Sequence, residues 1–366
     1  MPSVLITTSV ASSLLFRLEL IERLIENGYR VIIICAKNAV IINKLIDIGC
    51  EYLELKVNRQ GRNPLSDLSV LFQYIKIIKK VRPDIVLTYT VKPNIYASLA
   101  CQFLRVRYIN NITGLGVIGN KGIMQKGLFF LQRLAFQKSA CVFFQNTENE
   151  KLYNDNRLVT SRAKIVPGSG VNINRFNAVA YPEEQSTIRF LVISRLRRDK
   201  GYDELFYAIR NITLCNLEFH IVGSIENDKY EYEINSLKEN FSVWYYGTLA
   251  PEDVKNMIAE CHCLIHPSHS EGMANVILES AASARPVIAS DIPGCREAID
   301  DGISGYLFSM RDATSLVGCI EQFTKLSWDQ RKNMGVAGRR KMEREFDREV
   351  VVDAYIDEIQ SCIGSR

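Results

Sequence analysis

The stretch "DIVLTYT", residues 84–90, is followed by "NIYASLACQFL" at 94–104 and "VRYINNIT" at 106–113, and this succession decides the fold. The first and third segments are short runs rich in apolar and β-branched residues, which are typical of strands, and the middle one is long enough for a helix. A strand, a crossover helix and a second strand make the βαβ unit of a parallel sheet. Because such strands are buried on both faces, we expect helices on both sides of the sheet.

The same alternation continues on both sides of this unit as far as residue 146. The expected strands are 3–8, 30–36, 84–90, 106–113 and 140–146. The expected helices are 14–28, 38–49, 68–83, 94–104 and 123–138. The pattern predicts an α/β domain with a doubly wound sheet.

The pattern then restarts in the second half. The expected strands are 187–194, 217–223, 243–247, 263–268 and 286–290, and the expected helices are 202–212, 229–241, 251–261 and 275–284. Residues 166–186 between the halves are rich in Gly, Asn, Ser and Pro, which is linker chemistry. We therefore predict Rossmann-like domains at 1–170 and 171–345, and a C-terminal helix at 346–366 that packs back on the first domain. Open α/β sheets bind ligands beyond the carboxyl ends of their strands, so facing domains would place the site in the cleft between them.

Composition indicates an ordinary globular protein. The 366 residues are 47% apolar and 23% charged, and the net charge of +4 is too small to indicate nucleic acid as a partner. Ten scattered cysteines, several of them in apolar runs, favour a reducing compartment without disulfides. No basic leader and no uncharged stretch of about 18 apolar residues is present, so we expect neither a signal peptide nor a membrane-spanning helix.

Two motifs suggest cofactors and are discounted. "GLGVIG", Gly114 to Gly119, fits the dinucleotide pattern but follows a late strand, and no acid stands about 20 residues beyond it. A glycine-rich binding loop and a plain surface turn both remain open for this segment. Cys261 and Cys263, with nearby histidines, lack the second pair that structural zinc requires, and we expect no metal.

The stretch "SEGMANVILES", residues 270–280, sets Glu271 and Glu279 eight positions apart around the expected start of a helix. The first N–H groups of a helix bind anions, and a carboxylate accepts hydrogen bonds from pairs of hydroxyl groups. A sugar nucleotide fits this arrangement, with its diphosphate at the helix start, its sugar at one acid and its ribose at the other. A glycosidase pair would stand closer, since eight helical residues rise about 12 Å. A capped core helix with a solvated Glu is the alternative that the spacing leaves open.

Basic residues follow the first strand of the second half in "SRLRRDKGYDEL", residues 194–205. Arg195 and Lys200 would lie at the carboxyl end of that strand, where two cations can hold a diphosphate and stabilise its developing charge. A solvated basic loop is the alternative, and Arg197 and Arg198 are assigned to it.

Together these residues resemble the retaining GT-B glycosyltransferases of family 4, also called group 1. The stretch "HPSHSEGMANVILESAASARPVIASDIPGCREAIDDGISGYLF", residues 266–308, contains that family's E-x7-E motif. "ISRLRRDKGYDEL" at 193–205 is similar to its phosphate-binding segment, and "VPGSGVNINRF" at 166–176 to its hinge. "RPDIVLTYTVKPNIYASLA" at 82–100 and "NITGLG" at 111–116 resemble a subgroup that builds bacterial envelope polysaccharides, including O-antigen and capsule.

The resemblance implies a metal-independent enzyme without a cofactor, in which the leaving diphosphate itself deprotonates the acceptor and the anomeric configuration is retained. It assigns Glu271, Arg195 and Lys200 to catalysis. It places the donor against Glu279 and the backbone of Gly272, Met273, Ala274, Asn275, Gly247 and Thr248.

The first domain departs from the family pattern, because all four histidines lie in the second domain. Lys92 is the expected substitute for the family's first-domain His, and Arg17 for a glycine-rich phosphate contact. The candidates on the acceptor side are Arg17, Lys92, Tyr89, Gly114 and Gly116.

The resemblance implies a UDP-sugar donor whose sugar is an N-acetylhexosamine such as GalNAc. It implies a polyprenyl-diphosphate-linked saccharide as acceptor. We expect no nucleic-acid partner. Segment 122–140 alternates apolar bulk with Lys126, Arg133 and Lys138, and either lies on an anionic membrane or faces the core with a basic edge. We expect a cytoplasmic protein, peripheral at the inner face of the cytoplasmic membrane. A sugar-nucleotide epimerase and a non-catalytic sugar-nucleotide-binding protein remain the alternatives.

Overall fold

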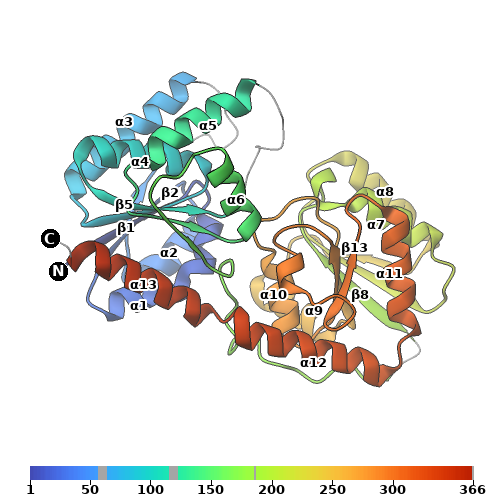
Figure 1. The fold of residues 1–366 in the computed structure, drawn as a ribbon. Coiled ribbons are helices and arrows are strands. Elements are labelled where there is room, and N and C mark those ends of the chain that lie inside the picture. Colours follow the sequence, from blue (N-terminus) through green and yellow to red (C-terminus); the bar gives the residue numbers. More distant parts are fainter. Residues whose placement is uncertain (57–63, 115–122, 185–186, 365–366) are drawn as a thin grey trace. The chain divides into compact units, whose positions relative to one another are not determined.

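The computed structural model describes residues 1–56, 64–114, 123–184 and 187–364, and divides into two compact units. Unit 1 comprises Met1–Ser169 and Glu349–Arg366, and unit 2 comprises Gly170–Arg348. Each unit has its own parallel sheet and its own cores (Figure 1). This is the GT-B architecture of two Rossmann-like domains, as the sequence pattern predicts.

The sheet of unit 1 has seven strands in the order β3-β2-β1-β4-β5-β6-β7, all paired in parallel. The strands are β1 (Ser3–Thr7), β2 (Arg30–Cys35), β3 (Glu51–Glu54), β4 (Ile85–Tyr89), β5 (Arg107–Ile112), β6 (Cys141–Phe144) and β7 (Arg162–Ile165). The sheet reverses its order of winding between β1 and β4, and that is where ligands bind in open α/β sheets.

Helices cover both faces of this sheet. They are η1 (Ala11–Arg17), α1 (Leu18–Glu26), α2 (Ala39–Asp47), α3 (Pro64–Val81), α4 (Val91–Leu104), α5 (Ile123–Phe136), α6 (Thr147–Asp155) and α13 (Arg348–Gly364). One core lies between the sheet and α1, α2 and α13. Two further cores lie under α3, α4 and α5 on the other face. Both faces of the central strands are therefore dry, and β1 and β4 are buried along their whole length.

The sheet of unit 2 has six parallel strands in the order β10-β9-β8-β11-β12-β13, with its switch point between β8 and β11. The strands are β8 (Ile188–Ile193), β9 (Leu217–Val222), β10 (Val243–Tyr245), β11 (Cys263–His266), β12 (Val287–Ser290) and β13 (Gly305–Phe308). The helices are η3 (Arg198–Lys200), α7 (Tyr202–Asn211), α8 (Asp228–Asn240), α9 (Pro251–Glu260), α10 (Asn275–Ala282), η4 (Arg296–Ala298), α11 (Ala313–Lys325) and α12 (Trp328–Glu345).

Capping separates two groups of helices. Side chains cap the N-termini of α2, α6, α8, α11 and α12. No side chain caps α4, α7 or α10, which follow the switch-point strands β4, β8 and β11. Their first N–H groups thus meet the carboxyl edge of the sheet without a side-chain acceptor from their own N-cap residue, which is the condition for binding an anion. Helices α1 and α9 also lack a side-chain cap, but α1 continues directly from η1, and Pro251 occupies the first turn of α9.

All ten cysteines lie in the described part of the chain and are free thiols. None of the helices that the structure describes is both long enough and apolar enough to cross a membrane. Among the same residues, no group of three or more His, Cys, Asp or Glu side chains forms a metal-binding cluster.

Candidate active site

The loops after β8 and β11 are joined tightly at the switch point of unit 2. The carbonyl of Asp199 accepts hydrogen bonds from the His269 N–H at 2.9 Å and from Ser268 Oγ at 3.3 Å. Gly201 has φ +73°, and a Cβ added there would lie 1.9 Å from the carbonyl oxygen of Pro267. Only glycine permits this approach, which brings the start of α7 against the loop that carries Glu271.

This junction brings Lys200 and Glu271 together. Lys200 Nζ donates to Glu271 Oε1 at 2.6 Å, and each side chain is only 16% exposed. His266, the last residue of β11, has its Nε2 3.0 Å from the same oxygen. Burial alone would raise the pKa of Glu271, but His266 and Lys200 outweigh it and lower that pKa to about 2. Glu271 is therefore a carboxylate at neutral pH.

His266 is the contact that the sequence did not indicate. It stood out only as a possible metal ligand, yet it is buried and its ring nitrogen contacts Glu271. His262, from the same group, serves the fold: its Nδ1 accepts from the Arg189 N–H at 3.0 Å. Burial lowers the pKa of His262 to about 4, so this ring is neutral. The signal for His266 was its position at the end of a switch-point strand, five residues before Glu271.

Arg195 does not join this cluster in the structure. Its Nη1 donates to Glu226 Oε1 at 2.9 Å, and the side chain is exposed. Arg195 still lies in the loop that follows β8, two residues after Ile193 ends the strand. Of the two predicted cations, the structure thus pairs Lys200 with Glu271 and Arg195 with a different carboxylate.

Glu279 lies on the second turn of α10 and is half-buried. Burial raises its pKa to about 7, against the opposing effect of Arg348 and Arg175. The N-terminus of the helix lies between the two acids in the sequence: Ala274 is the N-cap residue, and Asn275 Oδ1 is buried without a hydrogen-bond partner among the described residues. The two acids therefore differ in charge state, with Glu271 ionised and Glu279 titrating near neutrality.

The remaining donor-side candidates lie in or near the loop that carries Glu271, or in the loop after β10. Met273 and Ala274 are buried in the core under α10, and the Ala274 N–H donates to the Gly294 carbonyl at 3.0 Å. Gly294, with φ +83°, leaves no room for a Cβ because the Gly272 carbonyl oxygen would lie 2.7 Å away. The Gly247 carbonyl accepts from the Gly223 N–H at 2.7 Å, and Thr248 beside it is exposed.

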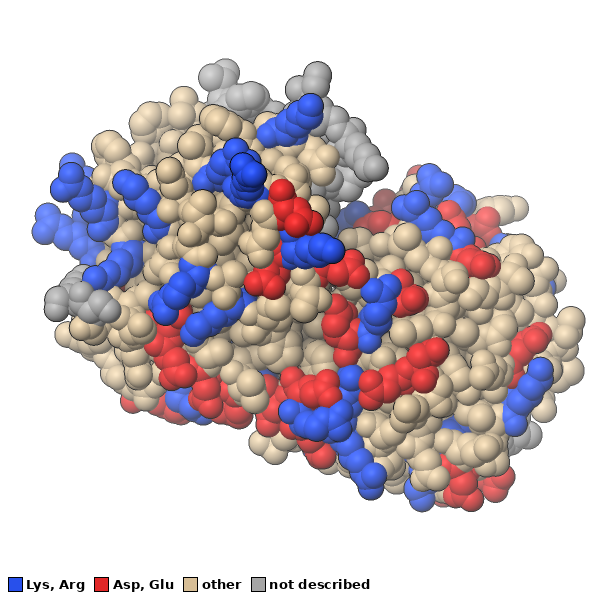
Figure 2. Space-filling model, in the orientation of Figure 1, with Lys and Arg blue, Asp and Glu red and all other residues tan. Residues whose placement is uncertain are grey.

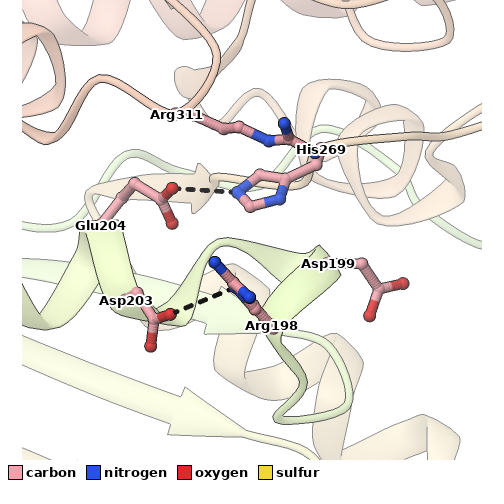
Figure 3. Close-up of a pocket in the computed structure, with 6 residues that line it drawn as sticks. All are labelled: Arg198, Asp199, Asp203, Glu204, His269 and Arg311. Carbon is pink, nitrogen blue, oxygen red and sulfur yellow. Dashed lines mark hydrogen bonds and ion pairs between the residues drawn. The ribbon is translucent and has the colours of Figure 1, made fainter.

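A polar pocket opens next to this junction, at the start of α7 (Figure 3). Glu204 points toward His269 across it, and His269 Nε2 lies 3.1 Å from Glu204 Oε1. The lining residues are Arg198, Asp199, Asp203, Glu204, His269 and Arg311. With three acids and two arginines, it is a mixed-charge surface beside Lys200.

The acceptor-side candidates lie at the switch point of unit 1. The guanidinium of Arg17 lies 4.8 Å from the ring centroid of Tyr89 and donates to Ser169 Oγ at 2.5 Å. Arg17 is buried, its Nε has no hydrogen-bond partner among the described residues, and burial raises the pKa of Tyr89. Lys92 Nζ pairs with Asp67 of α3 at 2.7 Å.

Thr90, between Tyr89 and Lys92, has φ +68°, which is strained for a β-branched residue. Its hydroxyl accepts from the Ser9 N–H at 3.0 Å and so ties the loops after β1 and β4 together. Backbone strain of this kind concentrates at functional sites. Gly114 ends the described segment before residue 115 with φ +146°, and Gly116 lies outside the described residues.

The two parallel sheets, each with its own switch point, define the GT-B architecture. The family description "Glycosyl transferases group 1" matches residues 175–341, and "Glycosyl transferase 4-like" matches residues 4–146. The chain belongs to the group 1 glycosyltransferases of family 4.

Two relatives from curated proteins illustrate the resemblance. One is the N,N'-diacetylbacillosaminyl-diphospho-undecaprenol alpha-1,3-N-acetylgalactosaminyltransferase of Campylobacter jejuni, which is 22% identical over 93% of each chain. The other is the UDP-Gal:alpha-D-GlcNAc-diphosphoundecaprenol alpha-1,3-galactosyltransferase of Escherichia coli, which is 23% identical over 71% of each chain.

Solved structures confirm the fold. A glycosyltransferase from Rickettsia africae superposes with a TM-score of 0.81 at 20% identity, covering 99% of this chain and 98% of its own. HepE from Anabaena, solved in complex with UDP and glucose, has a TM-score of 0.79 at 16% identity, covering 99% of this chain and 100% of its own.

Proposed function

We propose that the protein transfers a sugar from a UDP-sugar to a polyprenyl-diphosphate-linked saccharide, with retention of configuration. The sugar is an N-acetylhexosamine such as N-acetylgalactosamine, and the product enters an O-antigen, capsule or related polysaccharide. Two relatives are named for transfer to undecaprenyl-diphosphate-linked sugars, which supports this acceptor class. The reaction takes place at the inner face of the cytoplasmic membrane, with the protein bound peripherally.

The observation that carries the proposal is the position of Glu271. It is ionised and held by Lys200 and His266, at the switch point of unit 2 and directly before the uncapped α10. The uncapped helix start suits the diphosphate, and the fixed carboxylate suits the hydroxyl groups of the donor sugar. Glu279, one helical turn further, would accept hydrogen bonds from the ribose.

The chemistry follows from these assignments. The bond between the anomeric carbon and the diphosphate oxygen breaks, and negative charge grows on the leaving diphosphate. Lys200 and Arg195 stabilise that charge, with Arg195 leaving Glu226 to do so. The departing diphosphate takes the proton of the acceptor hydroxyl, which attacks from the same face. The cationic side chains fill the role of a metal ion, and we expect none to be required.

Unit 1 is proposed to bind the acceptor through Arg17, Tyr89, Lys92, Gly114 and Gly116. Arg17 is a buried cation, and no carboxylate among the described residues forms an ion pair with it, so a phosphate of the acceptor would compensate its charge. The strained Thr90 holds this loop in place.

A transfer assay tests the proposal. Purified protein is incubated with a panel of UDP-sugars and a polyprenyl-diphosphate-linked saccharide, and the anomeric configuration of the product is read by NMR. We expect transfer from one UDP-N-acetylhexosamine with retention. Glu271→Gln should reduce transfer at least about 100-fold, since it removes a charged group from the reacting centre. The exposed Glu260→Gln is the matched control. Full transfer by Glu271→Gln, or release of an epimerised UDP-sugar, would contradict the proposal.

A further inference from the structure

The positive charge of this protein is concentrated in one segment. Residues 64–138 contain eleven Lys and Arg and only two acidic residues, which gives this segment a net charge of +9. Because the whole chain carries +4, all the other residues together carry −5. The small overall charge therefore conceals a strongly basic region.

Three helices of this segment lie side by side on one face of the unit 1 sheet. Helices α3 and α4 share a core with β1, β2 and β4, and α4 and α5 share the next core along that face (Figure 1). The outward stripe of α3 is Leu68, Phe72, Lys76 and Lys80, each four residues after the last and each exposed. The exposed face of α5 carries Lys126, Phe130, Arg133 and Leu134. Helix α4 ends with exposed Phe103 and Arg105.

The fold uses some of the cations of this surface, since Arg133 donates to the carbonyls of Asn156 and Arg157. In the part of the chain that the structure describes, Lys76, Lys79, Lys80 and Lys126 form no ion pair. Both acids of the segment are engaged elsewhere: Asp67 pairs with Lys92, and Asp84 accepts from the Ser3 N–H at 2.8 Å. Figure 2 shows blue side chains spread over unit 1. Lys76, Lys79 and Lys80 of α3 and Lys126 of α5 thus add positive charge to the surface without an acidic partner among the described residues.

Large apolar side chains lie among these cations. Phe103 is 74% exposed, and Phe72 and Phe130 are each 60% exposed, one on each of the three helices. Leu68 and Leu134 add exposed aliphatic surface on α3 and α5. Bulky apolar groups interspersed with Lys and Arg are the composition of surfaces that settle into the headgroup region of anionic bilayers. Nucleic acid would use the cations and could stack on aromatic rings, but it has no use for exposed leucines.

We propose that the outer face of α3, α4 and α5, with Phe72, Phe103 and Phe130 as apolar contacts and Lys76, Lys79 and Lys80 as cationic contacts, docks on a bilayer containing anionic lipid. This basic–aromatic surface extends the membrane contact expected of segment 122–140 to three helices. The inference rests on the proposed function only in that a lipid-linked acceptor requires the enzyme to reach a membrane.

Vesicle sedimentation tests this surface. The full-length protein is mixed with vesicles of phosphatidylcholine alone or with about 30% phosphatidylglycerol, at low and high salt. Each basic residue near an anionic surface contributes about 1 kcal/mol, or about fivefold in binding. The variant Lys76→Glu/Lys79→Glu/Lys80→Glu should therefore bind the anionic vesicles at least tenfold more weakly. The matched control is Lys238→Glu/Lys325→Glu/Lys332→Glu, which makes the same charge change at exposed positions of unit 2.

A second variant separates apolar docking from charge alone. Phe72→Ser/Phe103→Ser/Phe130→Ser should lose the part of vesicle binding that survives high salt, and it keeps every charge. Unchanged vesicle binding by both variants would overturn the proposal. So would a result in which the lysine variant loses binding to a single-stranded oligonucleotide but keeps its binding to vesicles.

Activity on a short-chain, water-soluble acceptor distinguishes this inference from the proposed function. The lysine variant should transfer sugar to that acceptor at the wild-type rate. If the wild-type protein binds anionic vesicles through this surface but transfers no sugar, the proposed function fails and the docking surface stands. If transfer occurs and the control variant loses as much vesicle binding as the lysine variant, the surface is wrong and the function stands.

Discussion

Glu271 receives both of its neighbours on one carboxylate oxygen, since Lys200 and His266 both contact Oε1. No described side chain forms a hydrogen bond or ion pair with Oε2. A hydrogen bond to a charged group contributes about 1.5–3 kcal/mol. The pair therefore fixes the direction of the acid as well as its charge.

Replacing Lys200 tests the importance of this pairing. Lys200→Met keeps the side-chain volume but leaves Glu271 with His266 alone, and it removes one cation from the leaving group. We expect kcat/KM to fall by at least about 100-fold, consistent with one lost electrostatic contact in a transition state. Steady-state kinetics check this, with Lys229→Met at the exposed start of α8 as the control. Equal kcat/KM values for the two variants would show that Lys200 does not contribute to catalysis.

Glu279 makes the stability of the protein depend on pH with the opposite sign to that of an ordinary paired acid. Its pKa in the folded protein is raised from 4.5 to about 7, so the protonated form is favoured by folding. Its contribution to stability is present below pH 4.5 and is lost as the pH rises through 7. We expect Glu279→Gln to gain about 1–3 kcal/mol over the wild type between pH 5 and pH 8, measured by urea unfolding. If the free energies of unfolding of the variant and the wild type differ by a constant amount across that pH range, the raised pKa of Glu279 is contradicted.

At this scale, the sequence singled out the acids and cations of two loops but not the contacts between them. Lys200 was expected at the carboxyl end of the first strand of the second half, and Glu271 before a helix start, but the ion pair between them was not predicted. The ion pair between Arg195 and Glu226 was not predictable, because a long exposed side chain can pair with any of several carboxylates. The contact between His266 and Glu271 was not predicted, because a single His before "PSHSEG" gives no local indication of a contact with a loop residue.

The elements that position the site depend on close backbone approaches. Gly201 joins the start of α7 to the loop after β11, and Gly294 supports the backbone of Gly272. Both glycines have positive φ, so a side chain would add conformational strain to a steric clash. The geometry of the loop that carries Glu271 thus depends on glycines, which have no side chain.

Gly201→Ala should show this directly. The new Cβ would lie 1.9 Å from the Pro267 carbonyl oxygen, which forces the two loops apart. We expect a stability loss of about 2 kcal/mol or more and a marked loss of UDP affinity, measured by thermal unfolding and by calorimetric titration. The control is Gly318→Ala on α11, where a Cβ meets no atom within 4 Å and the helix favours alanine. If Gly201→Ala binds UDP with wild-type affinity, UDP binding does not depend on the close approach of these two loops.

The long apolar strands and the helices between them were predictable, and the polar edge elements were not. The sequence pattern missed β3 and β7 at the two edges of the sheet, because each has two exposed and two partly buried residues and includes charged side chains. It missed α6 because "TENEKLYND" has almost no apolar face. It also predicted one helix over 14–28, whereas the structure has the 3-10 helix η1 up to Arg17 and then α1.

At the scale of the whole molecule, the chain leaves unit 1 and returns to it. Helix α13 follows unit 2 in the sequence but packs into the core of unit 1 through Val351, Val352, Tyr355, Ile356 and Ile359. Glu358 on the same helix is buried and pairs with Lys164 of the edge strand β7 at 2.9 Å. The stability of unit 1 therefore depends on a helix that is distant in sequence.

Ile359→Ala measures this dependence. The side chain is fully buried, and its truncation leaves a cavity that costs about 2–5 kcal/mol. We expect the unfolding transition of unit 1 to shift while the transition stabilised by UDP stays in place, as seen by calorimetry with and without UDP. Val350→Ala, at a side chain that is 54% exposed, should change neither transition. A shift of the UDP-stabilised transition alone would contradict the assignment of α13 to unit 1.

The chain passes between the units at Ser169–Gly170 and at Arg348–Glu349. Next to these two points, within unit 2, the Arg348 N–H donates to the Val171 carbonyl at 3.1 Å. A ribosome makes the strands of unit 1 first, then all of unit 2, and only afterwards α13. Unit 2 thus has its complete set of residues while unit 1 still exposes the apolar groove that α13 will fill. During synthesis, unit 2 can therefore fold first, and unit 1 can complete its core only after α13 has been made.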